Sequence, residues 1–226
     1  MPLGQPQKNH EAFLEEVFSG KPSEIRLQQI VKQLKKDKTS SPCDDAVHEV
    51  LGVALMRLNR VEQAIPELVT AFRMSPCESY ANNLLLGYRE ADKLNEGLKF
   101  NINNLDYIRG CLATSVILAG DYSEHIIDLL EGDDVSVVRA ALESGMQNEL
   151  TSIFRFLVEI TPYGTGYSFE SDKEEGHWII DISISLNSEE SEAVSFSKQI
   201  SRALSQKYSP EVLMKIVPLI SYQVAA

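Results

Sequence analysis

Residues 41–77 read SPCDDAVHEVLGVALMRLNRVEQAIPELVTAFRMSPC, a segment that begins and ends with the same tripeptide. The two copies of Ser-Pro-Cys lie 34 residues apart, the length of one helix-turn-helix unit in a repeat protein. Between them, Gly52 and Ala64 are small enough to let two helices approach closely. Large residues that would fill the seam stand at Leu51, Leu55 and Leu68. The segment therefore predicts two packed helices, the second ended by Pro76.

This order of large, small and breaker residues resembles a tetratricopeptide repeat. The resemblance implies that further helix pairs stack on this one, because a single unit cannot bury its apolar face. A second, degenerate unit is predicted to begin at Glu78, with Gly97 at its tight contact. Residues 125–145 also resemble a HEAT-type helical repeat, and either label predicts stacked helices.

Two amphipathic helices are predicted before the repeat, at residues 9–19 and from about Ser23 to Lys38. The second ends in a group of lysines, which is either a docking patch or a solvated helix end. The group comprises Lys32, Lys35, Lys36 and Lys38.

The tetratricopeptide resemblance also implies a concave groove that receives a peptide or helix from a partner protein. The side chains expected on it are Glu49, Val53, Met56 and Arg57 from the first unit and Asn82, Asn83 and Arg89 from the second. Asparagine and arginine there could hold an extended backbone or a carboxylate. We therefore expect a non-catalytic adaptor or regulator of another protein.

Near Gly145 the apolar period changes from helical to alternating, which predicts a domain boundary. Residues 1–148 are expected to form the helical repeats, and residues 149–226 a small β-β-β-α-β domain, giving an α+β fold. The predicted strands are 154–160, 167–171, 178–186 and 214–222, and the helix is 188–208. Pro218 places the last strand at an edge or a bulge. This order loosely resembles the C-terminal domain of enhanced-serine-sensitivity proteins, which implies no known chemistry.

Charge is divided unevenly along the chain. Residues 1–120 hold 14 Lys and Arg against 15 Asp and Glu, whereas residues 121–226 hold 7 against 18, a net of −11. Because an acidic half repels phosphates, nucleic acid and anionic membranes are not expected partners. A protein with a basic surface is the expected partner. The chain has no apolar run long enough to span a bilayer and no secretory start, which predicts a soluble cytoplasmic protein.

Residues that could carry catalysis form no complete pattern. The four histidines stand far apart, so no metal site and no cofactor are expected. The segment 160–167 resembles the start of the metal site of 2-oxoglutarate/iron oxygenases, but no histidine follows His177 to complete the ligands. We therefore predict a protein that is not an enzyme and keep a degenerate oxygenase as an alternative. A second alternative is a structural homodimer formed through the sheet edge near Pro218 or through the strand at Phe154.

Overall fold

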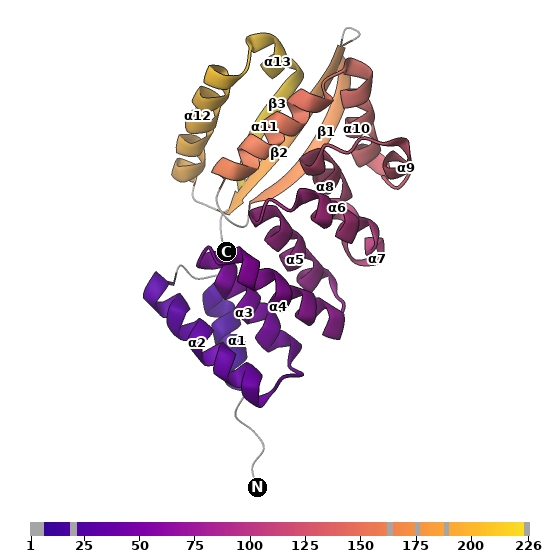
Figure 1. Cartoon of the computed structure of the whole chain (residues 1–226). Coiled ribbons are helices and arrows are strands. Elements are labelled where there is room, and N and C mark those ends of the chain that lie inside the picture. Colours follow the sequence, from indigo (N-terminus) through magenta and orange to yellow (C-terminus); the bar gives the residue numbers. More distant parts are fainter. Residues whose placement is uncertain (1–6, 19–21, 162–164, 175–176, 188–189, 224–226) are drawn as a thin grey trace. The chain divides into compact units, whose positions relative to one another are not determined.

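The computed structural model describes residues 7–18, 22–161, 165–174, 177–187 and 190–223 (Figure 1). The chain divides into two compact units, Met1–Arg109 and Gly110–Ala226, which we call the helical unit and the sheet unit. The sequence had placed the boundary after residue 148. The helices between 110 and 148 therefore belong to the unit that contains the sheet.

The helical unit consists of helices joined by short turns. They are α1 (Gln7–Phe18), α2 (Glu24–Ser40), α3 (Asp45–Arg57), α4 (Val61–Met74), α5 (Glu78–Glu90), α6 (Leu94–Ile102) and α7 (Leu105–Ile108). The predicted helices at 9–19 and from Ser23, and the pair within 45–77, are confirmed. Ser23 caps α2 by accepting a hydrogen bond from the backbone N–H of Arg26.

The α3–α4 and α5–α6 pairs are closed by the same turn. Asn59 and Asp92 both adopt a left-handed backbone with φ of 55°. In each case the next residue donates its N–H to a carbonyl near the end of the preceding helix, Arg60 to Leu55 and Lys93 to Tyr88. Asn and Asp tolerate this conformation better than other side chains. The two pairs therefore repeat a local turn geometry, at positions 33 residues apart.

The predicted close approach of α3 and α4 is confirmed at Gly52. A Cβ at this position would lie 2.6 Å from the side chain of Leu68 and 3.4 Å from the carbonyl oxygen of Ala64. Any larger residue would have to displace Leu68, which is itself buried. Glycine is thus required here by space.

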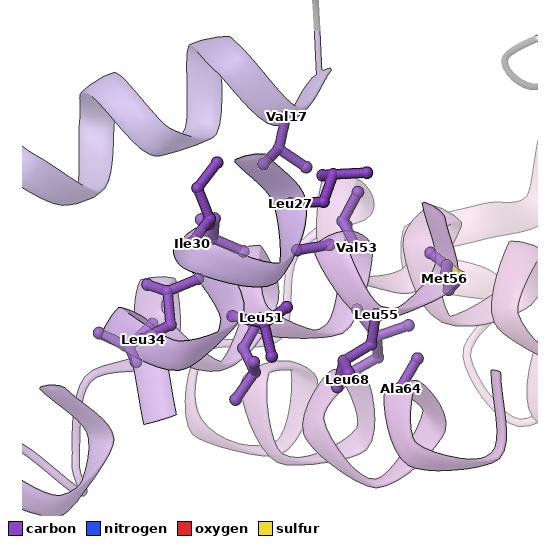
Figure 2. Close-up of a cluster of buried hydrophobic side chains, with 14 of the residues drawn as sticks. Val17, Leu27, Ile30, Leu34, Leu51, Val53, Leu55, Met56, Ala64 and Leu68 are labelled. Atoms are coloured by element: carbon purple, nitrogen blue, oxygen red, sulfur yellow. The ribbon is translucent and has the colours of Figure 1, made fainter. Parts of the chain in front are cut away.

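Helix α3 is the centre of the helical core. Every residue from Val47 to Met56 is buried, because α1, α2, α4 and α5 all pack against this helix. Figure 2 shows side chains of α1, α2 and α4 around it, including Val17, Leu27 and Leu68. A helix that is apolar on nearly all sides must be surrounded in this way.

A 3₁₀ turn at Arg109–Cys111 spans the boundary between the units, and the sheet unit continues with helices and a three-stranded sheet. Its helices are α8 (Leu112–Ala119), α9 (Glu124–Ile127), α10 (Gly132–Ser144), α11 (Gln147–Ile160), α12 (Glu190–Lys207) and α13 (Pro210–Lys215). Its strands are β1 (Gly166–Glu174), β2 (His177–Asn187) and β3 (Ile216–Gln223). The order in the sheet is β1-β2-β3, with β1 antiparallel and β3 parallel to β2.

The predicted strand at 154–160 is wrong, because these residues belong to helix α11. Phe154, Phe156, Val158 and Ile160 alternate as a strand would. However, Leu157 is also apolar and is fully buried, together with Leu150, Ile153 and Phe154. That spacing is helical, and it becomes visible only when the window starts at residue 147. The observed order after α11 is therefore β-β-α-α-β.

The remaining strands and the long helix α12 are confirmed, and the chain is an α+β protein with a small sheet after its helices. Phe154 of α11 packs edge-on against Tyr167 and Phe169 of β1, with ring centroids 5.0 and 4.9 Å apart. Pro218 lies in β3, an edge strand, as predicted. Among the described residues no helix is long and apolar enough to cross a membrane.

Candidate functional site

The residues predicted to line a groove are distributed between the core and the surface. Glu49, Val53, Met56 and Asn83 are buried, with exposed fractions of 5%, 0%, 6% and 9%. Asn82 is exposed, and Arg57 and Arg89 are partly buried. The predicted exposure of the first four is wrong.

Packing of α1 on α3 explains this correction for Val53 and Met56. Both belong to the hydrophobic core that also contains Val17 of α1 (Figure 2). Arg57 donates a hydrogen bond to the backbone carbonyl of Val17 at the end of α1. This side of α3 is therefore covered by the chain's own first helix.

Glu49 and Asn83 are brought together by the side-by-side arrangement of α3 and α5. The Asn83 amide donates to Oε1 of Glu49 over 2.9 Å, and the Ser79 hydroxyl donates to the same oxygen over 3.3 Å. Glu49 and Asn83 stand 34 residues apart in the chain. A hydrogen bond between residues one repeat length apart is what stacking of successive helix pairs produces.

Asp45 and Tyr80 extend this group toward the surface. The Tyr80 hydroxyl donates to Oδ2 of Asp45 over 3.3 Å, and both residues are half-buried. We call Asp45, Glu49, Ser79, Tyr80 and Asn83 the acidic cluster. It lies on the first two turns of α3 and α5.

Burial changes the acid–base behaviour of the acidic cluster. Loss of hydration raises the pKa of the Glu49 carboxyl, although the hydrogen bonds from Ser79 and Asn83 oppose this. Burial, together with the negative charges of Glu49 and Asp45, also raises the pKa of the Tyr80 hydroxyl. Two carboxyl groups and a phenol thus share a site in which negative charge is poorly solvated.

The acidic cluster differs from the neighbouring carboxylate of Glu67, which is paired with two basic side chains. Glu67 on α4 accepts hydrogen bonds from the Lys38 ammonium at 2.8 Å and pairs with His48 Nδ1 at 2.7 Å. In the described part of the chain, no Lys, Arg or His side chain lies within salt-bridge distance of Asp45 or Glu49. Buried charges are ordinarily paired, so the cluster suits a cation from another molecule.

Arg89 does not join the acidic cluster, because it lies two helical turns beyond Asn82 on α5. Its Nη2 atom pairs with Glu90 at 3.2 Å. Its Nε atom is buried without a hydrogen-bond partner among the described residues. The structure therefore unites two of the seven predicted residues, Glu49 and Asn83, in one hydrogen-bonded site.

The oxygenase-like segment is only partly visible, because Pro162, Tyr163 and Gly164 lie outside the described residues. Within the described ranges, no three His, Cys, Asp or Glu side chains gather closely enough to hold a metal ion. Comparison of the chain with protein-family models, curated proteins and solved structures finds no match. The tetratricopeptide resemblance thus stays a prediction.

Sequence reasoning missed Asp45, Ser79 and Tyr80. The 34-residue period contained a usable indication, since it relates Asp45 to Ser79 just as it relates Glu49 to Asn83. Adding 34 to the number of every polar residue of α3 would have pointed from Asp45 to Ser79. Tyr80 is one residue out of that register, so only the structure reveals its bond to Asp45.

Proposed function

We propose that this protein is a non-catalytic adaptor or regulator that binds a partner protein through the helical unit. The acidic cluster receives a Lys or Arg side chain of the partner. The observation that carries this proposal is the buried, hydrogen-bonded carboxyl of Glu49, which has Asp45 beside it and no cation among the described residues. This surface replaces the broad groove expected from the sequence.

The rim of the acidic cluster offers groups that suit a peptide. Ser79 and Asn82 are exposed, and Asp45 and Tyr80 are half-buried. A Lys ammonium or Arg guanidinium would reach the Asp45 carboxylate first and gain from the negative potential of Glu49 beneath it. Rim hydroxyl and amide groups would then bond the partner's backbone. Specificity for a basic side chain would follow from the negative charge of the two carboxyl groups and from the buried position of Glu49.

Cysteine chemistry agrees with action in the cytoplasm, which is part of this proposal. None of the three cysteines, Cys43, Cys77 and Cys111, forms a disulfide within the described chain. Cys43 is exposed, so in an oxidising compartment its thiol could form an unwanted disulfide with another molecule.

The homodimer alternative gains no support from β1, one of the two edge strands of the sheet. Strand β1 is an edge strand and exposes Glu170, Asp172, Lys173 and Glu174. Charged side chains on an edge strand oppose pairing with a second copy. A size-exclusion elution volume that shifts with concentration would return the homodimer to consideration.

Calorimetric titration with short peptides tests the proposal. The probe carries one Lys or Arg among neutral residues, and the matched probe carries Gln at that position. We expect saturable binding of the basic probe only, and about tenfold weaker binding by the Asp45→Asn variant, since a charged hydrogen bond is worth about 1.5 kcal/mol.

Asp106→Asn is the matched control, because it removes one exposed carboxylate from α7 of the same unit. It is expected to bind like the wild type. Equal binding of both probes, or equal weakening in both variants, would show that the acidic cluster does not recognise the cation.

A further inference from the structure

The sheet unit contains a hollow of about 510 Å³ beside α11, where the end of α12 and the end of α8 approach it. Its lining includes the side chains of Arg155, Lys207, Ser152, Thr151, Asn148 and Phe156. Nothing in the proposed function uses this hollow. Its volume lies within the roughly 300–1,000 Å³ of small-molecule sites.

Arg155 is held in place by neutral acceptors. Its Nε donates to the carbonyl of Leu118 over 2.7 Å and its Nη2 to the carbonyl of Ala119 over 3.3 Å. These carbonyls end helix α8, where a cation is favoured by the helix dipole. The two bonds orient the guanidinium without cancelling its charge.

Lys207 is held by aromatic rings. Its Nζ lies 4.6 Å from the ring centroid of Phe156 and 5.5 Å from that of Tyr208. The Tyr208 hydroxyl is in turn hydrogen-bonded to that of Ser152 over 2.8 Å, which ties the end of α12 to α11. Cation–π contacts hold the ammonium in place without neutralising its charge.

The balance of charge in the hollow is positive. Glu159 also lines it, but within the described residues no carboxylate lies within salt-bridge distance of Arg155 or Lys207. This is unusual in a half of the chain that carries only 7 basic residues against 18 acidic ones. With so many carboxylates nearby in sequence, two unpaired cations on one hollow indicate a site for an anion.

We propose that this cationic hollow binds a small molecule that carries an oxyanion, either a carboxylate or a phosphate. Arg155 and Lys207 bind the anionic group from two sides. The Ser152 hydroxyl and the Asn148 amide supply neutral hydrogen bonds, and Phe156 contacts the apolar part of the ligand. This site is independent of the acidic cluster on the helical unit.

NMR titration of the full chain at constant ionic strength tests this proposal, with phenyl phosphate and benzoate as the two probes. We expect saturable shifts confined to residues around 148–159 and 207 for at least one probe, and the stronger probe identifies the oxyanion. Lys207→Gln is expected to weaken binding about tenfold, the effect of losing one charge-assisted hydrogen bond.

Lys198→Gln is the matched control, because Lys198 is exposed on α12, nine residues before Lys207. It should leave the affinity unchanged. Arg155→Gln provides a second test, with circular dichroism to show that α8 and the fold persist. Two results would each overturn the proposal: no saturable shift with either probe, or equal weakening by Lys198→Gln.

Discussion

The two units reverse the charge that their compositions suggest. The helical unit lies in the nearly neutral half of the chain, yet its acidic cluster has two carboxyl groups without a cation among the described residues. The sheet unit lies in the half with a net charge of −11, yet its cationic hollow holds two basic side chains that form no salt bridge with a carboxylate among the described residues. Net charge reports long-range attraction, whereas a binding site depends on which charges the fold leaves unpaired.

Overpacking of the α3–α4 contact gives the largest expected effect on this comparison. Gly52→Val places atoms where Leu68 already lies, and overpacking of this kind costs about 3 kcal/mol. We expect the variant to lose binding of basic peptides while the sheet unit keeps its anion binding. Thermal denaturation followed by both titrations measures this. Simultaneous loss of both activities would contradict the independence of the two sites.

Charge reversal at each site gives the next largest effect. Asp45→Lys should weaken basic-peptide binding by about thirtyfold, or about 2 kcal/mol, and leave anion binding intact. Lys207→Glu should do the reverse. A double-variant protein that loses both activities independently would sharpen the comparison, whereas cross-effects between the two titrations would break it.

High pH should weaken the sheet unit at Tyr122. Burial raises the pKa of its hydroxyl from 10.0 to about 12, and this hydroxyl is bonded to Thr151 beside the cationic hollow. Because the folded pKa is the higher one, the stabilisation is complete below pH 10 and is lost as pH rises toward 12. Denaturant unfolding across this range should show the loss, and Tyr122→Phe should remove that part of it.

Glu49→Gln should produce the smallest effect, a modest gain in stability at neutral pH. The folded protein raises the pKa of this carboxyl, so the fold favours its protonated form and loses that stabilisation as pH rises through the folded pKa. Gln keeps an amide oxygen for the Asn83 hydrogen bond. Melting temperatures of the two proteins should therefore differ at pH 7 and converge in acid. A difference that does not change with pH would contradict this explanation.

Several features of the fold follow from local sequence. The packed pair of α3 and α4 could be predicted from residue size. The small residues Gly52 and Ala64 leave room where the side chain of Leu68 packs between the two helices. Strand β2 follows from strict alternation of apolar and polar residues from Ile180 to Leu186. The sequence predicted a strand in place of helix α11, because residues 154–160 alternate between apolar and polar side chains with a single exception at Leu157.

Both sites depend on contacts that the sequence does not specify. Val53 and Met56 were expected on a surface because nothing local shows that α1 returns to cover α3. The cationic hollow joins Arg155 and Lys207, which no period relates. They come together only because the end of α12 contacts α11, where Lys207 lies over the ring of Phe156.

The carboxyl resonance of Glu49, followed by NMR through a pH titration with and without a lysine-bearing peptide, tests the central claim most directly. The free protein is predicted to show a pKa above that of an ordinary glutamic acid, because burial strips the carboxyl of hydration. Bound peptide is predicted to lower it, because an ammonium group favours the ionised form. A pKa that stays unchanged when the peptide binds would contradict the claim that the acidic cluster is where the partner's basic side chain is received.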